Sequence, residues 1–196
     1  MRSDVRRDLS WSAAAFLSLV WPVVSKGCGG GELVPVENAT DDDMAAQLDM
    51  LAGIDAWQMH SEKGLRGIAS RVQEGKAWDT FTIRYARANG QETEYAKRIR
   101  ALDEVEQGWL YPHLTIQAYV NDEHSELLSC AVVRTCDLFR AAQHAEAEGI
   151  PDAREIFDHG HTIYLNRAYD NNEFIVVPWD MLQTNGVKIG IWRLSK

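Results

Sequence analysis

The chain has 196 residues, 45% of them hydrophobic and 25% charged, which is the composition of a soluble globular protein of one domain. Its net charge of −9 argues against a protein that coats nucleic acid by bulk electrostatics, but not against an enzyme that meets DNA through a local basic cleft. The three cysteines have no zinc-binding spacing and no disulfide framework, which predicts a reducing, cytoplasmic location.

The N-terminal segment starts with basic residues and continues into the apolar run LSWSAAAFLSLVWPVV, as a signal peptide does. Asp4 and Asp8 interrupt the basic region, and the run is too short to span a bilayer as a helix. We therefore predict no membrane association. The run is instead predicted to be an amphipathic helix that starts near Asp8 or Ser10, ends at Pro22 and belongs to the fold.

A glycine-rich run, GCGGG, leads from this helix into a short strand predicted at residues 32–37. Such a run could cradle a phosphate, but no Lys-Ser/Thr pair follows it and no helix opens there. We predict a loop or hinge. Residues 39–51 follow as a helix with Thr40 or Asp41 as N-cap and acidic residues in its first turn.

The central part of the chain predicts three successive strands and a helix. Residues 53–75 predict two strands joined by a polar turn at 61–64, and 78–87 alternate apolar with polar side chains as a third strand does. Residues 92–107 have a helical pattern. The second half predicts strands at 113–120, 126–135, 162–169, 173–178 and 186–194, a helix that Asp137 starts and that runs to 149, and a short helical turn at 179–182. The fold class is therefore α/β, with a mixed central sheet flanked by helices.

The segment 53-GID-55, with the strand 67-GIASRVQ-73 after it, resembles the PD-(D/E)XK nuclease family. The strand 79-DTFTIR-84 and the helix with 92-ETEYAKR-98 follow in the family's order. The resemblance implies a restriction endonuclease-like core at 32–140, preceded by an N-terminal helix and glycine-rich loop at 1–31 and followed by C-terminal strands at 141–196. It also implies that the core contains a meander of three strands. The implied activity is metal-dependent hydrolysis of phosphodiester bonds, with DNA preferred over RNA as the substrate.

The second half of the family motif departs from the pattern. If Arg71 stands where the family has lysine, the preceding acid position is Ala69, which cannot bind a metal ion. If Gln73 is the polar ligand, the basic position falls on Gly75. Related enzymes can place these groups on the neighbouring helix. Two acid–base pairs there have suitable spacing, namely Glu94 with Lys97 and Glu92 with Arg98, while earlier acids are available at Glu37 and Asp49.

Phosphodiester hydrolysis of this kind needs Mg²⁺ or Mn²⁺ held by several oxygen ligands, and a basic residue that orients the phosphate or the nucleophile. The predicted catalytic residues are Asp55, Arg71, Gln73 and Lys97. The predicted metal ligands are Asp55, Gln73, Glu37 and Glu94. Arg84 and Arg87 could line a basic groove, or simply lie on an exposed strand face.

Three functions are open at this point: a metal-dependent nuclease, a catalytically inactive protein of the same fold that binds nucleic acid or protein, and an α/β domain that uses the glycine-rich loop to bind a small molecule, for example a nucleotide. A homodimer is compatible with the first two. Asp158, His159 and His161 resemble a metal cluster, but no further ligand lies near in sequence, and we predict a polar loop. Cys130 and Cys136 flank an apolar strand and are predicted to be small buried residues.

Overall fold

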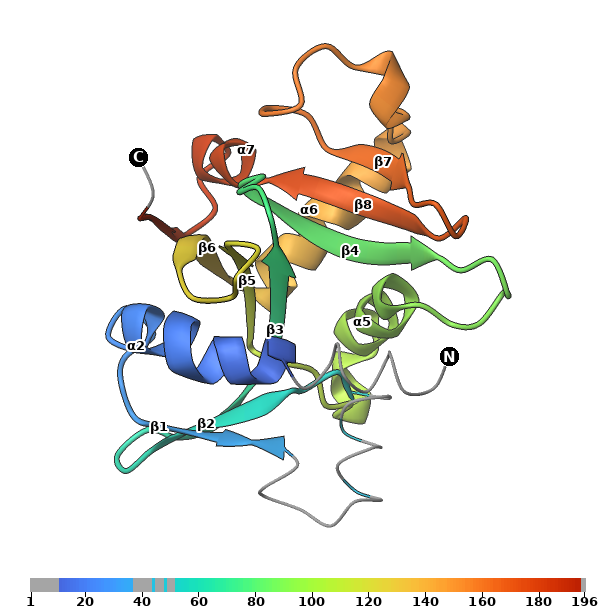
Figure 1. Ribbon diagram of the computed structural model, residues 1–196. Coiled ribbons are helices and arrows are strands. Elements are labelled where there is room, and N and C mark those ends of the chain that lie inside the picture. Colours follow the sequence, from blue (N-terminus) through green and yellow to red (C-terminus); the bar gives the residue numbers. More distant parts are fainter. Residues whose placement is uncertain (1–10, 37–43, 45–47, 49–51, 195–196) are drawn as a thin grey trace.

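The computed structural model describes residues 11–36, 44, 48 and 52–194. It is a mixed α/β structure with two sheets (Figure 1). The larger sheet has six strands in the order β1-β2-β3-β5-β6-β9, and the smaller has three in the order β4-β8-β7. The strands are β1 Glu32–Pro35, β2 Ala56–His60, β3 Gly64–Glu74, β4 Thr80–Ala86, β5 Leu114–Val120, β6 Leu127–Arg134, β7 Tyr164–Arg167, β8 Glu173–Pro178 and β9 Ile189–Arg193. The predicted mixed central sheet is therefore confirmed.

The N-terminal helix continues beyond the point predicted for its end. Residues 11–15 are α-helical, η1 (Phe16–Val20) is a π-helical turn, and α2 (Trp21–Val24) begins directly after it. Pro22 is the second residue of α2, which directly follows the π-helical turn within a continuous helical segment. The helix therefore accommodates the proline instead of ending there. Within the described part of the chain, no helix is long and apolar enough to cross a membrane.

The hairpin predicted in the central part is confirmed. Strands β2 and β3 pair antiparallel, with Ala56 opposite Ile68. On its other edge β3 pairs with β5 in parallel, which requires a crossover connection. Strand β4 and helix α5 (Glu94–Asp103) form that crossover. The predicted helix 39–51 lies outside the described residues, apart from Met44 and Leu48.

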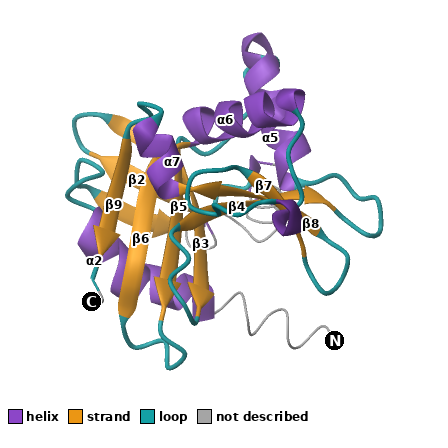
Figure 2. Ribbon diagram, turned by 90° about the horizontal axis from the view of Figure 1, so that it is seen from above, coloured by secondary structure: helices purple, strands orange, loops and turns teal. Residues whose placement is uncertain are grey.

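Strand β4 forms where predicted but joins a different sheet from its predecessor. It pairs antiparallel with β8, so the implied three-strand meander is divided between two sheets (Figure 2). Asp79, with φ of 52°, precedes β4, and its carboxylate accepts hydrogen bonds from Ser129 and Arg193. Beyond this bend β4 buries Phe81 and Ile83 in the core, which fixes its position against β8.

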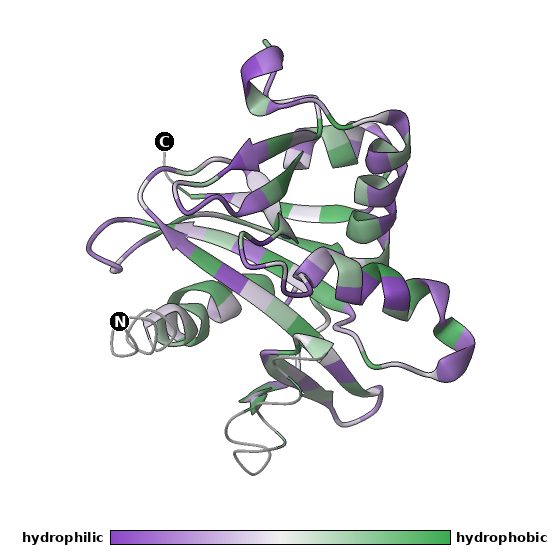
Figure 3. Cartoon of the chain, turned by 90° about the vertical axis from the view of Figure 1, so that its right-hand side faces the viewer, coloured by the Kyte–Doolittle hydropathy of each residue, from purple (hydrophilic) through white to green (hydrophobic). Residues whose placement is uncertain are grey.

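The central strands separate two hydrophobic cores because successive side chains point to opposite faces. On one face, Ile68, Ile116 and Val132 pack with residues of the N-terminal helix. On the other, Tyr119 and Val133 pack with the smaller sheet and with helices α5, α6 (Thr135–Glu148) and α7 (Trp179–Thr184). Helix α6 starts at Thr135 rather than Asp137. Its ribbon and that of α5 carry both hydrophobic and hydrophilic bands, as expected for helices with one packed face (Figure 3).

The structure also bears on the predictions for residues 158–161 and for two of the cysteines. Residues 158–161 form an exposed turn, as predicted, in which the ring of His161 contacts Asp158 at 3.1 Å. Cys130 is buried as predicted, whereas Cys136 is only partly buried, because it lies at the start of α6 beside Arg134.

Candidate functional site

A cleft of about 610 Å³ lies on the face of the large sheet opposite the N-terminal helix. Residues from the start of β2, from β3, β4 and β5, and from α5 line it. Its cationic lining residues are Arg71, Arg84, Arg87, Lys97 and Arg98, and its acidic ones are Asp55, Glu92 and Glu94. The cleft, here called the basic cleft, thus has an excess of positive charge although the chain carries a net charge of −9. It unites Asp55, Arg71, Glu94 and Lys97, which were predicted as site residues.

Asp55 is a half-buried residue immediately before β2. Its backbone N–H donates to the carbonyl of Ile68 at 2.9 Å, which extends the β2–β3 pairing by one step. Its carboxylate Oδ2 accepts a hydrogen bond from the backbone N–H of Ser70 at 2.5 Å and contacts the Ser70 hydroxyl at 3.3 Å. The carboxylate is therefore held against β3 at the wall of the cleft, which accounts for an acid within an apolar run.

Gly53 allows a close approach between the β2 start and α5. Its φ of 54° lies in the left-handed region. A Cβ atom at this position would overlap Nη2 of Arg98 and lie 2.9 Å from its Cζ. Arg98 is only 3% exposed. The glycine of the GID segment thus has a physical role, because it makes room for a buried guanidinium from α5 beside Asp55.

Arg71 links three elements around the cleft. Its Nη1 donates to the carbonyl of Thr82 at 2.7 Å and to the Thr82 hydroxyl at 2.9 Å. Its Nη2 forms an ion pair with Glu94 at 3.0 Å. The same Glu94 oxygen accepts a hydrogen bond from the backbone N–H of Arg84 at 3.4 Å. Arg71 and Glu94 therefore tie β3 to β4 and α5.

Gln73 does not belong to the lining of the basic cleft. Its Oε1 accepts a hydrogen bond from Nε2 of Gln117 at 3.0 Å, and Gln117 is 2% exposed. Gln117 in turn contacts the Thr82 hydroxyl at 3.4 Å. Sequence reasoning missed Thr82 and Gln117 as cleft residues. Thr82 could have been found as the polar side chain between the apolar Phe81 and Ile83, whereas the placement of Gln117 depends on the pairing of β3 with β5.

Arg84 and Arg87 line the cleft, as one of their two interpretations predicted. Burial, reinforced by the positive charges of Arg71 and Arg87, lowers the pKa of Arg84 below its usual value. The Arg84 guanidinium lies 5.6 Å from the ring centre of Phe174. Among the described residues, the buried Nε atoms of Arg84 and Arg87 have no hydrogen-bond acceptor. The cleft therefore holds cationic donors that the protein itself does not fully satisfy.

A Mg²⁺ site needs several oxygen ligands. The predicted ligand oxygens of Asp55, Gln73 and Glu94 accept hydrogen bonds from Ser70, Gln117 and Arg71 respectively. Within the described ranges, no group of three or more His, Cys, Asp or Glu side chains could hold a metal ion. The other predicted ligand, Glu37, and the available acid Asp49 lie outside those ranges.

Comparison with protein-family models, with curated proteins and with solved structures gave no match to this chain.

Proposed function

We propose that the basic cleft binds the phosphodiester backbone of a nucleic acid, DNA ahead of RNA, on a restriction endonuclease-like core. The observation that carries this proposal is the local excess of positive charge in an acidic chain. Arginine guanidinium groups bind phosphate oxygens through charge-assisted, often bidentate hydrogen bonds. A cleft with such a local field attracts a polyanion even when the protein as a whole repels it.

The state of Arg84 and Arg87 supports a ligand rather than an internal structural role. Their Nε donors lack acceptors among the described residues, and the like charges of Arg71, Arg84 and Arg87 oppose one another. A bound phosphate would supply acceptors and a compensating negative charge at once. Glu94 already neutralises Arg71 in part, so Arg84 and Arg87 are the residues we expect to contribute most to binding.

An apolar groove of about 880 Å³ beside the cleft supports nucleic acid over a small anion. Lys97 lines both the groove and the cleft. Trp57 and Trp109 also line the groove, and Trp109 is 55% exposed while its Nε1 donates to Glu104 at 2.9 Å. A tryptophan held in this way offers a fixed aromatic face for stacking of a base whose phosphate occupies the cleft.

Binding without catalysis is the function that we favour, because within the described ranges no group of three or more His, Cys, Asp or Glu side chains could hold a metal ion. The second candidate is metal-dependent hydrolysis by a PD-(D/E)XK-like nuclease. One observation favours it, namely that Asp55, Arg71, Glu94 and Lys97 line a single cleft. In either case Arg71, Arg84 and Arg87 would hold the phosphate.

Fluorescence polarisation with labelled single-stranded DNA, duplex DNA and RNA, in EDTA and at several salt concentrations, tests the binding proposal. Arg84→Ala and Arg87→Ala should each weaken binding and reduce the slope of log affinity against log salt by about 1. Arg154→Ala is the matched control, because Arg154 is exposed and lies outside the cleft. Equal losses in all three variants, or no binding of any nucleic acid, would refute the proposal.

Incubation with plasmid, single-stranded DNA and RNA in Mg²⁺ or Mn²⁺ separates binding from hydrolysis. Cleavage that Asp55→Ala abolishes would establish the nuclease and reject the purely binding function. Retention of substrate binding without any cleavage would reject the nuclease.

A further inference from the structure

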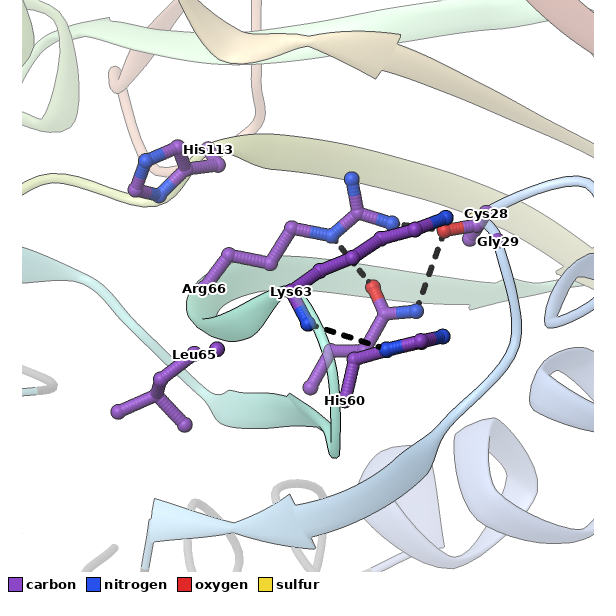
Figure 4. Close-up of a pocket in the computed structure, with 9 residues that line it drawn as sticks. Cys28, Gly29, His60, Lys63, Leu65, Arg66 and His113 are labelled. Carbon is purple, nitrogen blue, oxygen red and sulfur yellow. Dashed lines mark hydrogen bonds between the residues drawn. The ribbon is translucent and has the colours of Figure 1, made fainter.

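A second cavity, of about 280 Å³, lies between the glycine-rich loop 27–31 and the β2–β3 hairpin, and is here called the loop cavity (Figure 4). Arg66 lines it from β3. Arg66 shares a strand face with Ile68, whose side chain packs with the N-terminal helix, whereas Arg71 points to the other face. The loop cavity and the basic cleft are therefore separate sites on opposite faces of the sheet.

The lining of the loop cavity is cationic. Lys63 and Arg66 carry full positive charges, His60 and His113 add imidazole rings, and no carboxylate belongs to the lining. Neither Lys63 nor Arg66 forms an ion pair with any acid in the part of the chain that the structure describes. In a protein of net charge −9, two neighbouring cations without a carboxylate partner indicate a site for an anion from outside the chain.

The Arg66 guanidinium is positioned by neutral groups. Its Nε donates to Oε1 of Gln58 at 2.6 Å, and its Nη2 donates to the carbonyl of Cys28. Gln58 is 2% exposed and itself donates to the carbonyl of Cys28 at 3.2 Å. These contacts fix the orientation of the guanidinium without neutralising its charge. A preformed arginine of this kind binds an oxyanion with little loss of side-chain entropy.

The hydrogen bonds of the His60 ring determine which of its nitrogens can donate. Its Nδ1 accepts hydrogen bonds from the backbone N–H groups of Glu62 at 3.1 Å and Lys63 at 3.2 Å. The neutral ring must therefore carry its proton on Nε2. Figure 4 shows the side chains of His60, Lys63 and Arg66 extending towards the Cys28–Gly29 segment, while His113 stands farther away. The nitrogens of Lys63 and Arg66 thus lie at the same end of the cavity, which the His60 ring also lines.

The glycine-rich loop contributes space rather than backbone donors. A Cβ atom on Gly29 would lie 3.9 Å from both Nζ of Lys63 and Nη2 of Arg66. The N–H groups of Gly29 and Gly30 donate to the carbonyls of Lys26 at 3.1 Å and Ser25 at 2.8 Å. The loop is therefore not a phosphate-binding loop of the P-loop type, in which backbone amides hold the anion.

We propose that the loop cavity binds the phosphate group of a small phosphomonoester, through Arg66, Lys63 and Nε2 of His60. An ammonium, a guanidinium and an imidazole in one cavity suit a phosphate, which has several oxygens to bind, better than a planar carboxylate, which the fork of one arginine satisfies. The cavity is large enough to hold a phosphate together with part of the group that carries it. This proposal does not depend on the basic cleft.

Isothermal titration calorimetry with inorganic phosphate, a nucleoside 5′-monophosphate and acetate tests the site, and the ¹H–¹⁵N signal of Arg66 Nε reports its location. We expect both phosphates to bind, acetate to bind at least tenfold more weakly, and Lys63→Gln to weaken phosphate binding at least fivefold. Tighter binding of the monophosphate than of inorganic phosphate would identify a phosphomonoester site; equal binding would identify a site for the free ion and overturn the phosphomonoester assignment.

Further variants show whether the phosphate binds in the loop cavity. Arg66→Lys retains the charge but loses the fork, and should weaken phosphate binding; Lys63→Gln remains decisive if that variant fails to fold, because Lys63 is exposed. Lys76→Gln, on an exposed lysine outside the cavity, is the control that should retain the phosphate affinity, whereas Arg84→Ala, in the basic cleft, reports whether the phosphate binds there instead. Loss of phosphate binding in Arg84→Ala but not in Lys63→Gln would assign the phosphate to the cleft and overturn the inference.

Discussion

The glycine before Asp55 offers a direct test of how the basic cleft is assembled. Gly53→Ala introduces two separate costs at one position. The left-handed φ of 54° costs an L-residue about 1–2 kcal/mol. The new Cβ atom also displaces the buried guanidinium of Arg98, and leaving such a group poorly satisfied costs about a further 1–3 kcal/mol.

Gly90→Ala is the matched control for this substitution. Gly90 also has a left-handed φ, of 70°, but no atom lies within 4 Å of the added Cβ. Urea or thermal unfolding of the two variants should therefore differ by the Arg98 contribution alone, about 1–3 kcal/mol, or roughly 2–12 °C in Tm for a chain of this size. Equal losses of stability in the two variants would refute the inference that Gly53 makes room for Arg98. Nucleic-acid binding should fall only in Gly53→Ala.

Three further changes test other contacts. Glu94→Gln removes an acid from the cleft and weakens a partly exposed ion pair with Arg71, so the free energy of unfolding should fall by less than about 1 kcal/mol. The affinity for DNA should rise in a polarisation assay, because the positive charge of the cleft increases. A lower affinity would contradict the proposal that this positive charge attracts DNA. The hydrogen bond from Tyr85 to Glu146 at 2.7 Å, together with burial, raises the pKa of Tyr85 to about 12 from 10.0. This stabilisation should be complete below pH 10 and lost as the pH rises towards 12, and Tyr85→Phe should flatten the pH dependence of urea unfolding in that interval; an unchanged slope would exclude it. Asp55→Ala removes a charged acceptor and should lower the free energy of unfolding by about 1.5–3 kcal/mol in calorimetry, whereas Asp55→Asn, which keeps an acceptor, should cost less. Equal losses in the two variants would contradict a stabilising role for the hydrogen bond from Ser70.

Strand positions were predictable from the sequence because each strand carries a local pattern. The alternation within 78–87 predicted β4, and the apolar run 126–135 predicted β6. The partner of β4 was not predictable, because a pattern of buried side chains shows that a strand is buried but not which strand it pairs with. The pairing with β8 depends on the bend at Asp79 and on packing with residues distant in the sequence, such as Trp179.

The candidate site was also predictable only in part from the sequence. Asp55, Arg71 and Lys97 were grouped by a resemblance in the order of elements, and they do line one cleft. Gln73 was grouped with them because one register of the family motif makes it the polar ligand, but its side chain bonds to Gln117 on the neighbouring strand. Spacing within one strand gives the direction of a side chain. It does not give the partner that a neighbouring strand presents.

Strand β3 spans Gly64–Glu74 and carries a guanidinium for each of the two sites, Arg66 on one face and Arg71 on the other. The two arginines are five positions apart along the strand, an odd step, which places their side chains on opposite faces. Any insertion or deletion of a single residue between them would change that parity and bring both guanidinium groups to the same face, so that one site would lose its central cation whichever half of the strand kept its register. Only insertions or deletions of two residues within this segment would keep Arg66 and Arg71 on opposite faces of the sheet. A β-bulge of one extra residue there would remove one arginine from its site without substituting any lining residue of either site.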